Sequence, residues 1–490
     1  MHRLLPSNAR TRGLTTVGAA VLSLLWLSGS RPRAAQPSGG GFDFSATMRV
    51  DYFHAGGPKT GESFALDRVV NDGPWAGSRT QLVDDTNLGK YLFEVRAKPS
   101  AAVLYSRGFA SIYGEWETTP EVKTAQRTFH ESMRMPWPSA PVTIALKKRQ
   151  RDNSFREVWS VDVDPSSRFV NRARLAPRPG SVWPVMENGP IAQKVDLLII
   201  GEGYTREQLP KFHADVTRLT ATLFAQEPFK SRKSDFNVRA LDLPSAQSGI
   251  NRPNANVFRR TPISAEYNVF DSERYVLTLD NRALRDAASA APYEFLEILV
   301  NDKTYGGGGI FNDQATASVD SAFSDYVFVH EFGHHFAALA DEYYTSDVAY
   351  ETGAADLPEP WEPNATALKD PASLKWRDLM MPGTPVPTPW EKDTFEQESR
   401  ATQERRRAIR ARNAPEAEMD ALFREQRDRE EKLLGGTKYA RTVGAFEGAN
   451  YEARGLYRPE VDCIMFTRDR IGFCGVCRRA IARIIDLYSK

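Results

Sequence analysis

Two histidines with a glutamate between them, His330-Glu331-Phe332-Gly333-His334, constrain this chain more than any other stretch. Residues four apart lie on one face of a helix, about 6 Å from each other, so His330 and His334 can reach one metal ion. Glu331 then points beside the ion, where a general base for a water molecule is needed. The spacing therefore predicts a helix that carries two ligands and a base, and it favours zinc as the metal.

A third ligand from further along the chain has to be a carboxylate, because no histidine follows His335. Asp341 and Glu342 are the nearest candidates, seven and eight residues past His334. On a straight helix, Asp341 would lie about 10 Å further along the axis than His334, at 1.5 Å per residue. The helix must therefore end near residues 337–339 and fold back. We favour Asp341 and keep Glu342 as the alternative, and we expect His335 to face away from the ion.

The length and charge of the chain set its broad class. Its 490 residues suffice for two or three domains, and 64 basic against 63 acidic residues leave it nearly neutral. This balance gives no sign of a nucleic-acid partner. Residues 1–35 have a basic start, an apolar run over 14–27 and small residues after it, which is typical of a cleavable export signal and its lead-in. The run is short for a membrane span, so we expect a secreted or periplasmic protein without stable membrane insertion.

All three cysteines, Cys463, Cys474 and Cys477, lie near the C-terminus. In an oxidising compartment this number predicts one disulfide and one free thiol, with the pairing left open. A zinc site made of the three cysteines is the less favoured interpretation, because no histidine lies near them in the sequence.

Residues 42–171 are predicted to form an all-β sandwich. Short β-branched or aromatic runs, such as 91–96, 142–146 and 158–163, are separated there by turn residues. His54 and His130 lack the spacing of metal ligands, so a binding or scaffolding role suits this region better than chemistry. Residues 176–189 are rich in proline and glycine and are predicted to be a linker.

Residues 190–490 alternate strand and helix patterns, which favours an α/β or α+β catalytic domain. The continuous apolar run 195–200 is typical of a strand buried on both faces. Four glycines, 306–309, precede the histidine motif; they predict either an edge strand to which a peptide substrate can add, or a plain flexible loop. Residues from about 391 to 435 are densely charged and are expected to form one or two solvated helices, as an insertion.

Several stretches together resemble metallopeptidase family 64, the IgA-peptidase family. They are the histidine motif with Leu339-Ala340-Asp341-Glu342-Tyr343, Gly455-Leu456-Tyr457-Arg458-Pro459, Cys463-Ile464-Met465 and Phe473-Cys474-x-x-Cys477; residues 88–93 and 105–111 resemble the N-terminal β domain of the family. The resemblance implies a zinc endopeptidase of metzincin-like architecture, with a methionine turn, here at Met465, beneath the metal. Metzincins have a glycine three residues past the second histidine and their third ligand six past it. This chain has Ala337 and Ala340 there.

We therefore predict an exported zinc endopeptidase that acts on protein or peptide substrates. His330, His334 and Asp341 would hold Zn²⁺ and leave a fourth position for water. Glu331 would take a proton from that water and pass it to the leaving amine.

Two other functions fit the same pattern. One is a surface binding or adhesion protein that holds zinc without turnover, although a purely structural site has no need of Glu331. The other is a zinc hydrolase of a non-protein amide. Tyr343, Tyr344 and Tyr457 are candidates for stabilising an oxyanion in either enzyme.

Overall fold

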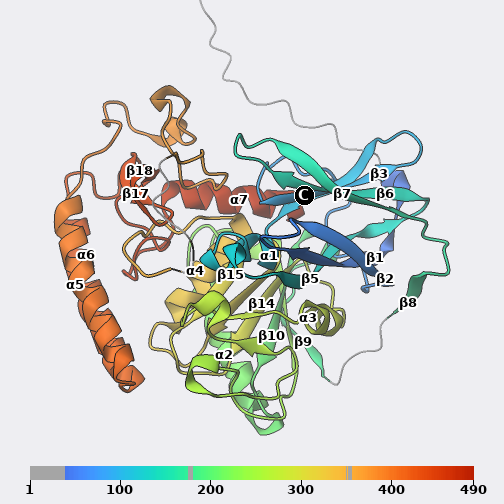
Figure 1. The fold of residues 1–490 in the computed structure, drawn as a ribbon, viewed down its shortest axis with the longest axis horizontal. Helices are drawn as coiled ribbons and strands as arrows, with labels where there is room; N and C mark the ends of the chain where they lie inside the picture. The colour runs from blue at the N-terminus through green and yellow to red at the C-terminus, as the bar shows by residue number, and fades with distance from the viewer. Residues whose placement is uncertain (1–38, 175–179, 349, 351–355, 490) are drawn as a thin grey trace, which may run out of the picture. The chain divides into compact units, whose positions relative to one another are not determined.

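The computed structural model describes residues 39–174, 180–348, 350 and 356–489. The export signal predicted for residues 1–35 lies outside these residues. The described chain is rich in β-structure, with several sheets and some helices, and an N-terminal β region precedes the region that carries the histidine motif (Figure 1). Among the helices of the described residues, none has the length and apolar character needed to cross a membrane.

Two four-stranded sheets build the N-terminal region, with the strand orders β5-β1-β2-β8 and β4-β3-β6-β7. Side chains of both sheets, among them Tyr52 of β1 and Phe93 of β3, are buried in one shared core, which is the arrangement of a β-sandwich. The strands are β1 (Phe42–Gly56), β2 (Ser63–Asn71), β3 (Tyr91–Ala97), β4 (Val103–Phe109), β5 (Arg127–Pro138), β6 (Val142–Arg149), β7 (Phe155–Val163) and β8 (Val170–Arg174). A short helix, α1 (Ile112–Trp116), follows β4.

The region after residue 180 is built on a six-stranded sheet with the order β15-β16-β14-β10-β11-β9. The four inner strands are parallel, and the two edge strands, β9 and β15, pair antiparallel with their neighbours. All residues of β10 are buried, as the apolar run 195–200 predicts. The strands are β9 (Val182–Met186), β10 (Val195–Glu202), β11 (Phe236–Leu241), β14 (Phe295–Val300), β15 (Gly307–Ile310) and β16 (Gln314–Ser318).

Part of the predicted linker, residues 176–189, belongs to this sheet. Residues 175–179 lie outside the described part of the chain, but Val182–Met186 form the edge strand β9, which pairs with β11. Pro184 is tolerated there because an edge strand needs ladder hydrogen bonds on one side only. Proline and glycine content therefore wrongly indicates a linker over these five residues.

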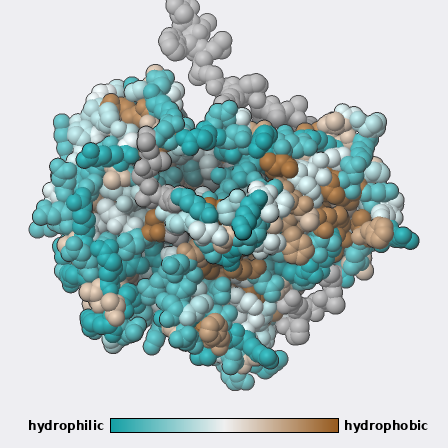
Figure 2. Space-filling model, viewed as in Figure 1, coloured by the Kyte–Doolittle hydropathy of each residue, from teal (hydrophilic) through white to brown (hydrophobic). Residues whose placement is uncertain are grey.

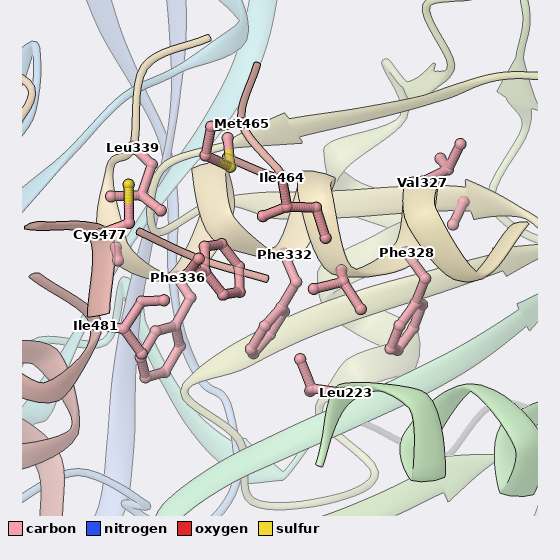
Figure 3. Close-up of a cluster of buried hydrophobic side chains, with 14 of the residues drawn as sticks. Leu223, Val327, Phe328, Phe332, Phe336, Leu339, Ile464, Met465, Cys477 and Ile481 are labelled. Atoms are coloured by element: carbon pink, nitrogen blue, oxygen red, sulfur yellow. The ribbon is translucent and has the colours of Figure 1, made fainter. Parts of the chain in front are cut away.

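Helices cover both faces of the six-stranded sheet. Helices α2 (Leu209–Leu223), α4 (Ser324–Ala337) and α7 (Gly475–Ser489) pack in the core on one face, and α3 (Asn281–Ala288) packs in the core on the other. Phe328, Phe332 and Phe336 project from one side of α4 at four-residue intervals into the first core (Figure 3). Since two residues correspond to about 200° around a helix, this phenylalanine row turns His330 and His334 toward the opposite side.

The charged stretch folds into two helices, α5 (Lys392–Ala411) and α6 (Glu416–Gly435), which lie side by side (Figure 1, orange). An ion pair of 2.7 Å between Arg405 and Glu425 joins them. Two further antiparallel pairs complete the fold, β12 (Ala265–Glu266) with β13 (Leu277–Thr278), and β17 (Phe446–Ala449) with β18 (Glu452–Arg458). Figure 2 shows a predominantly hydrophilic face with scattered hydrophobic residues.

Candidate functional site

The histidine motif lies on α4, and the chain reverses directly after this helix. Helix α4 ends at Ala337, and Ala338 follows in the left-handed conformation with φ 56° and ψ 34°. The N–H of Ala338 donates to the carbonyl of His334 (3.0 Å), and the N–H of Leu339 donates to the carbonyl of Gly333 (3.4 Å). These bonds close the last turn. The predicted end of the helix near residues 337–339 is confirmed, and the reversal brings the following residues back to the histidines.

Three ligand-type atoms meet at this reversal. The Nε2 atom of His330 lies 3.0 Å from Oδ1 of Asp341, Nε2 of His334 lies 3.2 Å from the same oxygen, and the two Nε2 atoms are 3.1 Å apart. Glu342 points elsewhere, with its Oε1 accepting from Nδ2 of Asn364 (2.9 Å). Of the two candidate carboxylates, Asp341 is therefore the one placed beside the histidines.

Hydrogen bonds at the other ring nitrogens determine where the imidazole protons lie. Nδ1 of His330 is 2.9 Å from the carbonyl oxygen of Ile464, and Nδ1 of His334 is 2.5 Å from that of Leu339. A carbonyl oxygen only accepts, so each Nδ1 carries a proton, and whenever a ring is neutral its Nε2 lone pair points into the site. Two lone pairs and a carboxylate oxygen within 3.2 Å repel one another unless a cation lies among them. The donor set therefore fits a metal ion.

The electrostatics of the site also favour a bound cation. Burial opposes ionisation of Asp341, but His334 and His330 hold the pKa of that carboxyl well below its usual range. Burial also lowers the pKa of His334, yet the adjacent Asp341 carboxylate outweighs it and raises the pKa to about 9. The place where the three side chains meet therefore stabilises positive charge.

Glu331 lines a cavity of about 540 Å³ at this point of the helix. Burial raises its pKa, and the two imidazoles oppose this shift. Gly307 and Gly309 of β15 pack against the same turn of α4. A Cβ on Gly309 would lie 2.3 Å from the carbonyl oxygen of Glu331, and one on Gly307 would lie 3.0 Å from its Cγ. Glycine at these positions lets the strand approach the helix closely.

The run 306–309 leads into an edge strand of the sheet, which confirms the strand interpretation over a plain loop. In an antiparallel pair, alternate residues direct N–H and C=O away from the partner strand. At Gly307 both groups bond to the segment 274–276 (3.0 and 3.1 Å), and the carbonyl of Phe311 accepts from the first residue after β4 (2.9 Å). Between them, Gly309 lines the cavity. Because it lies two residues from Gly307, its N–H and C=O are also expected to point away from β16.

The segment 463–466 forms the floor beneath the histidines. Besides the Ile464 carbonyl that holds His330, the carbonyl of Met465 accepts from the N–H of Glu342 (2.8 Å). A Cβ on Gly333 would lie 3.0 Å from the sulfur of Met465, so the methionine packs directly against the helix (Figure 3).

Comparison with protein families decides the classification. The family model described as IgA Peptidase M64 matches residues 183–485, and the model described as Peptidase M64 N-terminus matches residues 41–160. The chain belongs to the M64 peptidase family. This confirms the resemblance seen in the sequence, and it makes the protein a peptidase of protein or peptide substrates in a family of metallopeptidases. A search of curated proteins finds no match.

Two residues of this M64 peptidase that shape the site, Tyr451 and Arg274, give no signal in the sequence. The hydroxyl of Tyr451 donates to Oδ2 of Asp341 at 2.5 Å. Arg274 donates to the hydroxyl oxygen of Tyr343 (3.0 Å). Both tyrosines and the arginine line the cavity, but they come from loops far apart in the chain. Spatial proximity of this kind leaves no spacing pattern that could reveal it.

The N-terminal region also contributes to the cavity of the M64 peptidase. Glu115 of α1 accepts from the hydroxyl of Tyr350 (2.9 Å), and burial raises the pKa of Glu115 to about 7. Arg149, the last residue of β6, lines the same cavity. The β-sandwich therefore supplies wall residues as well as a scaffold.

Two of the three tyrosines predicted for oxyanion stabilisation lie away from the cavity. Tyr343 lines it, as described above. Tyr344 instead packs against Phe395 and Phe466, and Tyr457 lies on β18. A tyrosine beside a motif thus points toward the site or away from it according to the local backbone.

His335 faces away from the place where His330, His334 and Asp341 meet, as expected. Its Nε2 accepts from the N–H of Leu296 (3.1 Å), and its Nδ1 donates to the carbonyl of Ile310 (2.9 Å). Burial lowers its pKa to about 3, so it is a neutral residue that ties α4 to the sheet.

The three cysteines lie behind the floor of the site as buried free thiols. The Sγ atoms of Cys463 and Cys477 are 3.9 Å apart, whereas a disulfide bond measures about 2.05 Å. The prediction of one disulfide is therefore wrong for this structure.

Proposed function

We propose that this M64 peptidase is an exported zinc endopeptidase, with His330, His334 and Asp341 as the zinc ligands and Glu331 as the catalytic base. The observation that carries the proposal is the convergence of two imidazole lone pairs and a carboxylate oxygen beside Glu331, at the wall of a large cavity. Zinc accepts this mixture of nitrogen and oxygen ligands and leaves a fourth position open in catalytic sites.

The side chains divide the chemistry among them. When bound, zinc supplies a Lewis acid that polarises a carbonyl oxygen and lowers the pKa of water toward 7. Glu331 takes the proton from the attacking water and delivers it to the nitrogen of the leaving amine. Because Arg274 occupies a lone pair of the Tyr343 hydroxyl, the O–H of Tyr343 is free to donate to the oxygen of the peptide carbonyl.

A metzincin-like architecture with a one-residue shift accounts for the departures seen in the sequence. In this chain the left-handed residue is Ala338, four residues past His334. Metzincins have a glycine three residues past the second histidine. The ligand Asp341 is likewise seven past that histidine instead of six. Both shifts have the same size, because the helix runs one residue further before the chain reverses. Met465 packs beneath the helix, in the place of a methionine turn.

A peptide substrate is supported by the edge of the sheet. Gly309 lines the cavity, and the strand alternation turns its N–H and C=O away from β16, so an extended peptide could pair with them as an added strand. A cavity of about 540 Å³ is also within the range of specific binding sites. These features favour a peptidase over the hydrolase of a small non-protein amide and over a binding protein without turnover. Export rests on the pattern of residues 1–35.

Proteolysis of a mixed panel tests the proposal. The panel contains immunoglobulin A, unfolded casein and small non-peptide amides, and it is treated with wild type, with Glu331→Ala and with Glu425→Gln, an exposed control on α6. We expect wild type and the control to cleave a protein and Glu331→Ala to lose cleavage by at least about 1,000-fold at unchanged zinc content. Equal activity in all three, or cleavage of the small amides alone, would overturn the proposal.

A further inference from the structure

A second set of ligand-type atoms is buried behind the floor of the site. Cys463, Cys474, Cys477 and Glu342 bring three sulfur atoms and a carboxylate oxygen within 4.8 Å of one another. All four side chains are buried, with Cys463, Cys477 and Glu342 at 0 % exposure. The fourth member comes from residue 342, far from the cysteines in the sequence, which is why the cysteine spacing alone does not predict a four-ligand site.

The distances in this cluster match those around a tetrahedral zinc ion. Zn–S bonds of about 2.3 Å place two sulfur atoms about 3.8 Å apart, and a Zn–O bond of about 2.0 Å places oxygen about 3.5 Å from sulfur. The Sγ atoms of Cys463 and Cys477 are 3.9 Å apart, and Sγ of Cys477 is 3.5 Å from Oε1 of Glu342. A disulfide between Cys463 and Cys477 would need their Sγ atoms about 2.05 Å apart, much closer than they are.

Main-chain donors around the sulfurs favour thiolates. The N–H of Cys474 donates to Sγ of Cys463 (3.3 Å), and the N–H of Cys477 donates to Sγ of Cys474 (3.4 Å). Cys474 immediately precedes α7 and Cys477 lies in its first turn, where the helix dipole stabilises negative charge. Burial opposes ionisation and raises the pKa of Cys463 and Cys477 well above its usual value, and a bound cation would supply the positive charge that offsets this.

One buried carboxylate oxygen of the cluster lacks a partner that a cation would supply, and a buried arginine lies beside it. Oε2 of Glu342 has no hydrogen-bond partner among the described residues, and a buried carboxylate oxygen left in this way is costly. Beside the cluster, the fully buried Arg458 donates to the carbonyls of Gly448 (2.7 Å) and Val461 (3.0 Å) but forms no ion pair with a carboxylate of the described chain. Its charge is available to offset the negative charge that three thiolates and a carboxylate leave around a divalent ion.

We propose that Cys463, Cys474, Cys477 and Glu342 form a second, structural zinc site. Thiolate sulfur selects zinc among the common divalent ions, and four protein ligands leave no position for water, as in structural sites. The site adjoins the first one through two short segments. Glu342 follows Asp341, and Ile464, whose carbonyl fixes His330, follows Cys463. The second ion thereby fixes the floor on which the peptidase site rests.

Metal analysis of the full-length protein tests this inference and does not depend on the proposed catalytic function. We measure zinc per chain and the zinc X-ray absorption spectrum for wild type and for His334→Ala. The expected results are about two zinc ions in wild type and about one in His334→Ala, with sulfur neighbours near 2.3 Å in both and a larger sulfur share in the variant. Zinc without sulfur neighbours in both proteins would overturn the inference, as would an intact mass 2 Da lower from a disulfide.

Substitutions at the cluster give a second test. Cys474→Ser is expected to lose the sulfur-bound zinc, and Glu342→Gln to release it to a chelator at least about 10-fold faster. The control is Glu460→Gln, whose carboxylate accepts from the N–H of Gly475 beside the cluster without belonging to it. If Cys474→Ser does not fold, Glu342→Gln and its control decide the outcome. Equal release from Glu342→Gln, the control and wild type would contradict the assignment.

Discussion

The hydroxyl of Tyr451 holds the proposed third ligand, which makes Tyr451→Phe a sharp perturbation of the catalytic metal site. The substitution removes one hydroxyl, which donates to Oδ2 of Asp341 at 2.5 Å, and leaves the aromatic ring in place. Hydrogen bonds to charged groups contribute about 1.5–3 kcal/mol, and loss of a partner behind a metal ligand typically weakens metal binding by about 10- to 100-fold. We therefore expect the zinc Kd of the catalytic site to rise by about 10- to 100-fold.

The assay is recovery of peptidase activity when metal-free enzyme is titrated with buffered free zinc. Tyr350→Phe is the matched control, because its hydroxyl also lies in the cavity but donates to Glu115. The control should recover activity at the same free zinc concentration as wild type. A Tyr451→Phe curve that coincides with wild type would refute the reasoning that Asp341 binds the metal and is held by Tyr451.

Three further perturbations follow from the geometry. Gly309→Ala places a Cβ 2.3 Å from the carbonyl oxygen of Glu331, so it should lower both Tm and kcat/KM. Gly435→Ala is the control, because a Cβ there has no atom within 4 Å, and it should leave kcat/KM unchanged. Equal effects of the two substitutions would contradict the claim that β15 needs glycine to pack on α4. Ala338→Gly should raise the free energy of unfolding by up to about 1 kcal/mol in chemical denaturation, because the left-handed backbone disfavours a side chain, and a clear loss would contradict this. Burial raises the pKa of Glu202 to about 7, so the folded protein favours the protonated form of this side chain. The protonated Glu202 therefore contributes its full stabilisation below about pH 4.5, and this contribution is lost as the pH rises through about 7. The free energy of unfolding of Glu202→Gln minus that of wild type should therefore be about 2–3 kcal/mol larger at pH 8 than at pH 4.5. Parallel pH profiles of this free energy in the two proteins would contradict the prediction.

Local patterns in the sequence predict much of the fold. The apolar run 195–200 is a fully buried strand, because a strand with both faces in a core is apolar at every position. The runs 91–96 and 142–146 are strands of the sandwich, as their β-branched and aromatic residues predict. The end of α4 is likewise predictable, since only a reversal near residue 338 brings Asp341 back within reach of His334.

What escapes prediction depends on contacts between distant segments. Tyr451 meets Asp341 across 110 residues, and Glu115 reaches the cavity from the other region of the protein. Glu342 points away from the two histidines and lies in the cysteine cluster, and sequence spacing does not distinguish it from Asp341. Residues 182–186 carry a proline that indicates a linker, but tertiary pairing makes them an edge strand.

The central claim is that three named side chains hold a zinc ion beside Glu331. Anomalous X-ray diffraction at the zinc absorption edge, on crystals of the full-length protein, tests it most directly. The account predicts an anomalous peak about 2.0–2.2 Å from Nε2 of His330, Nε2 of His334 and a carboxylate oxygen of Asp341. No peak at that position in zinc-loaded crystals, or a peak there that Asp341 does not contact, would contradict it.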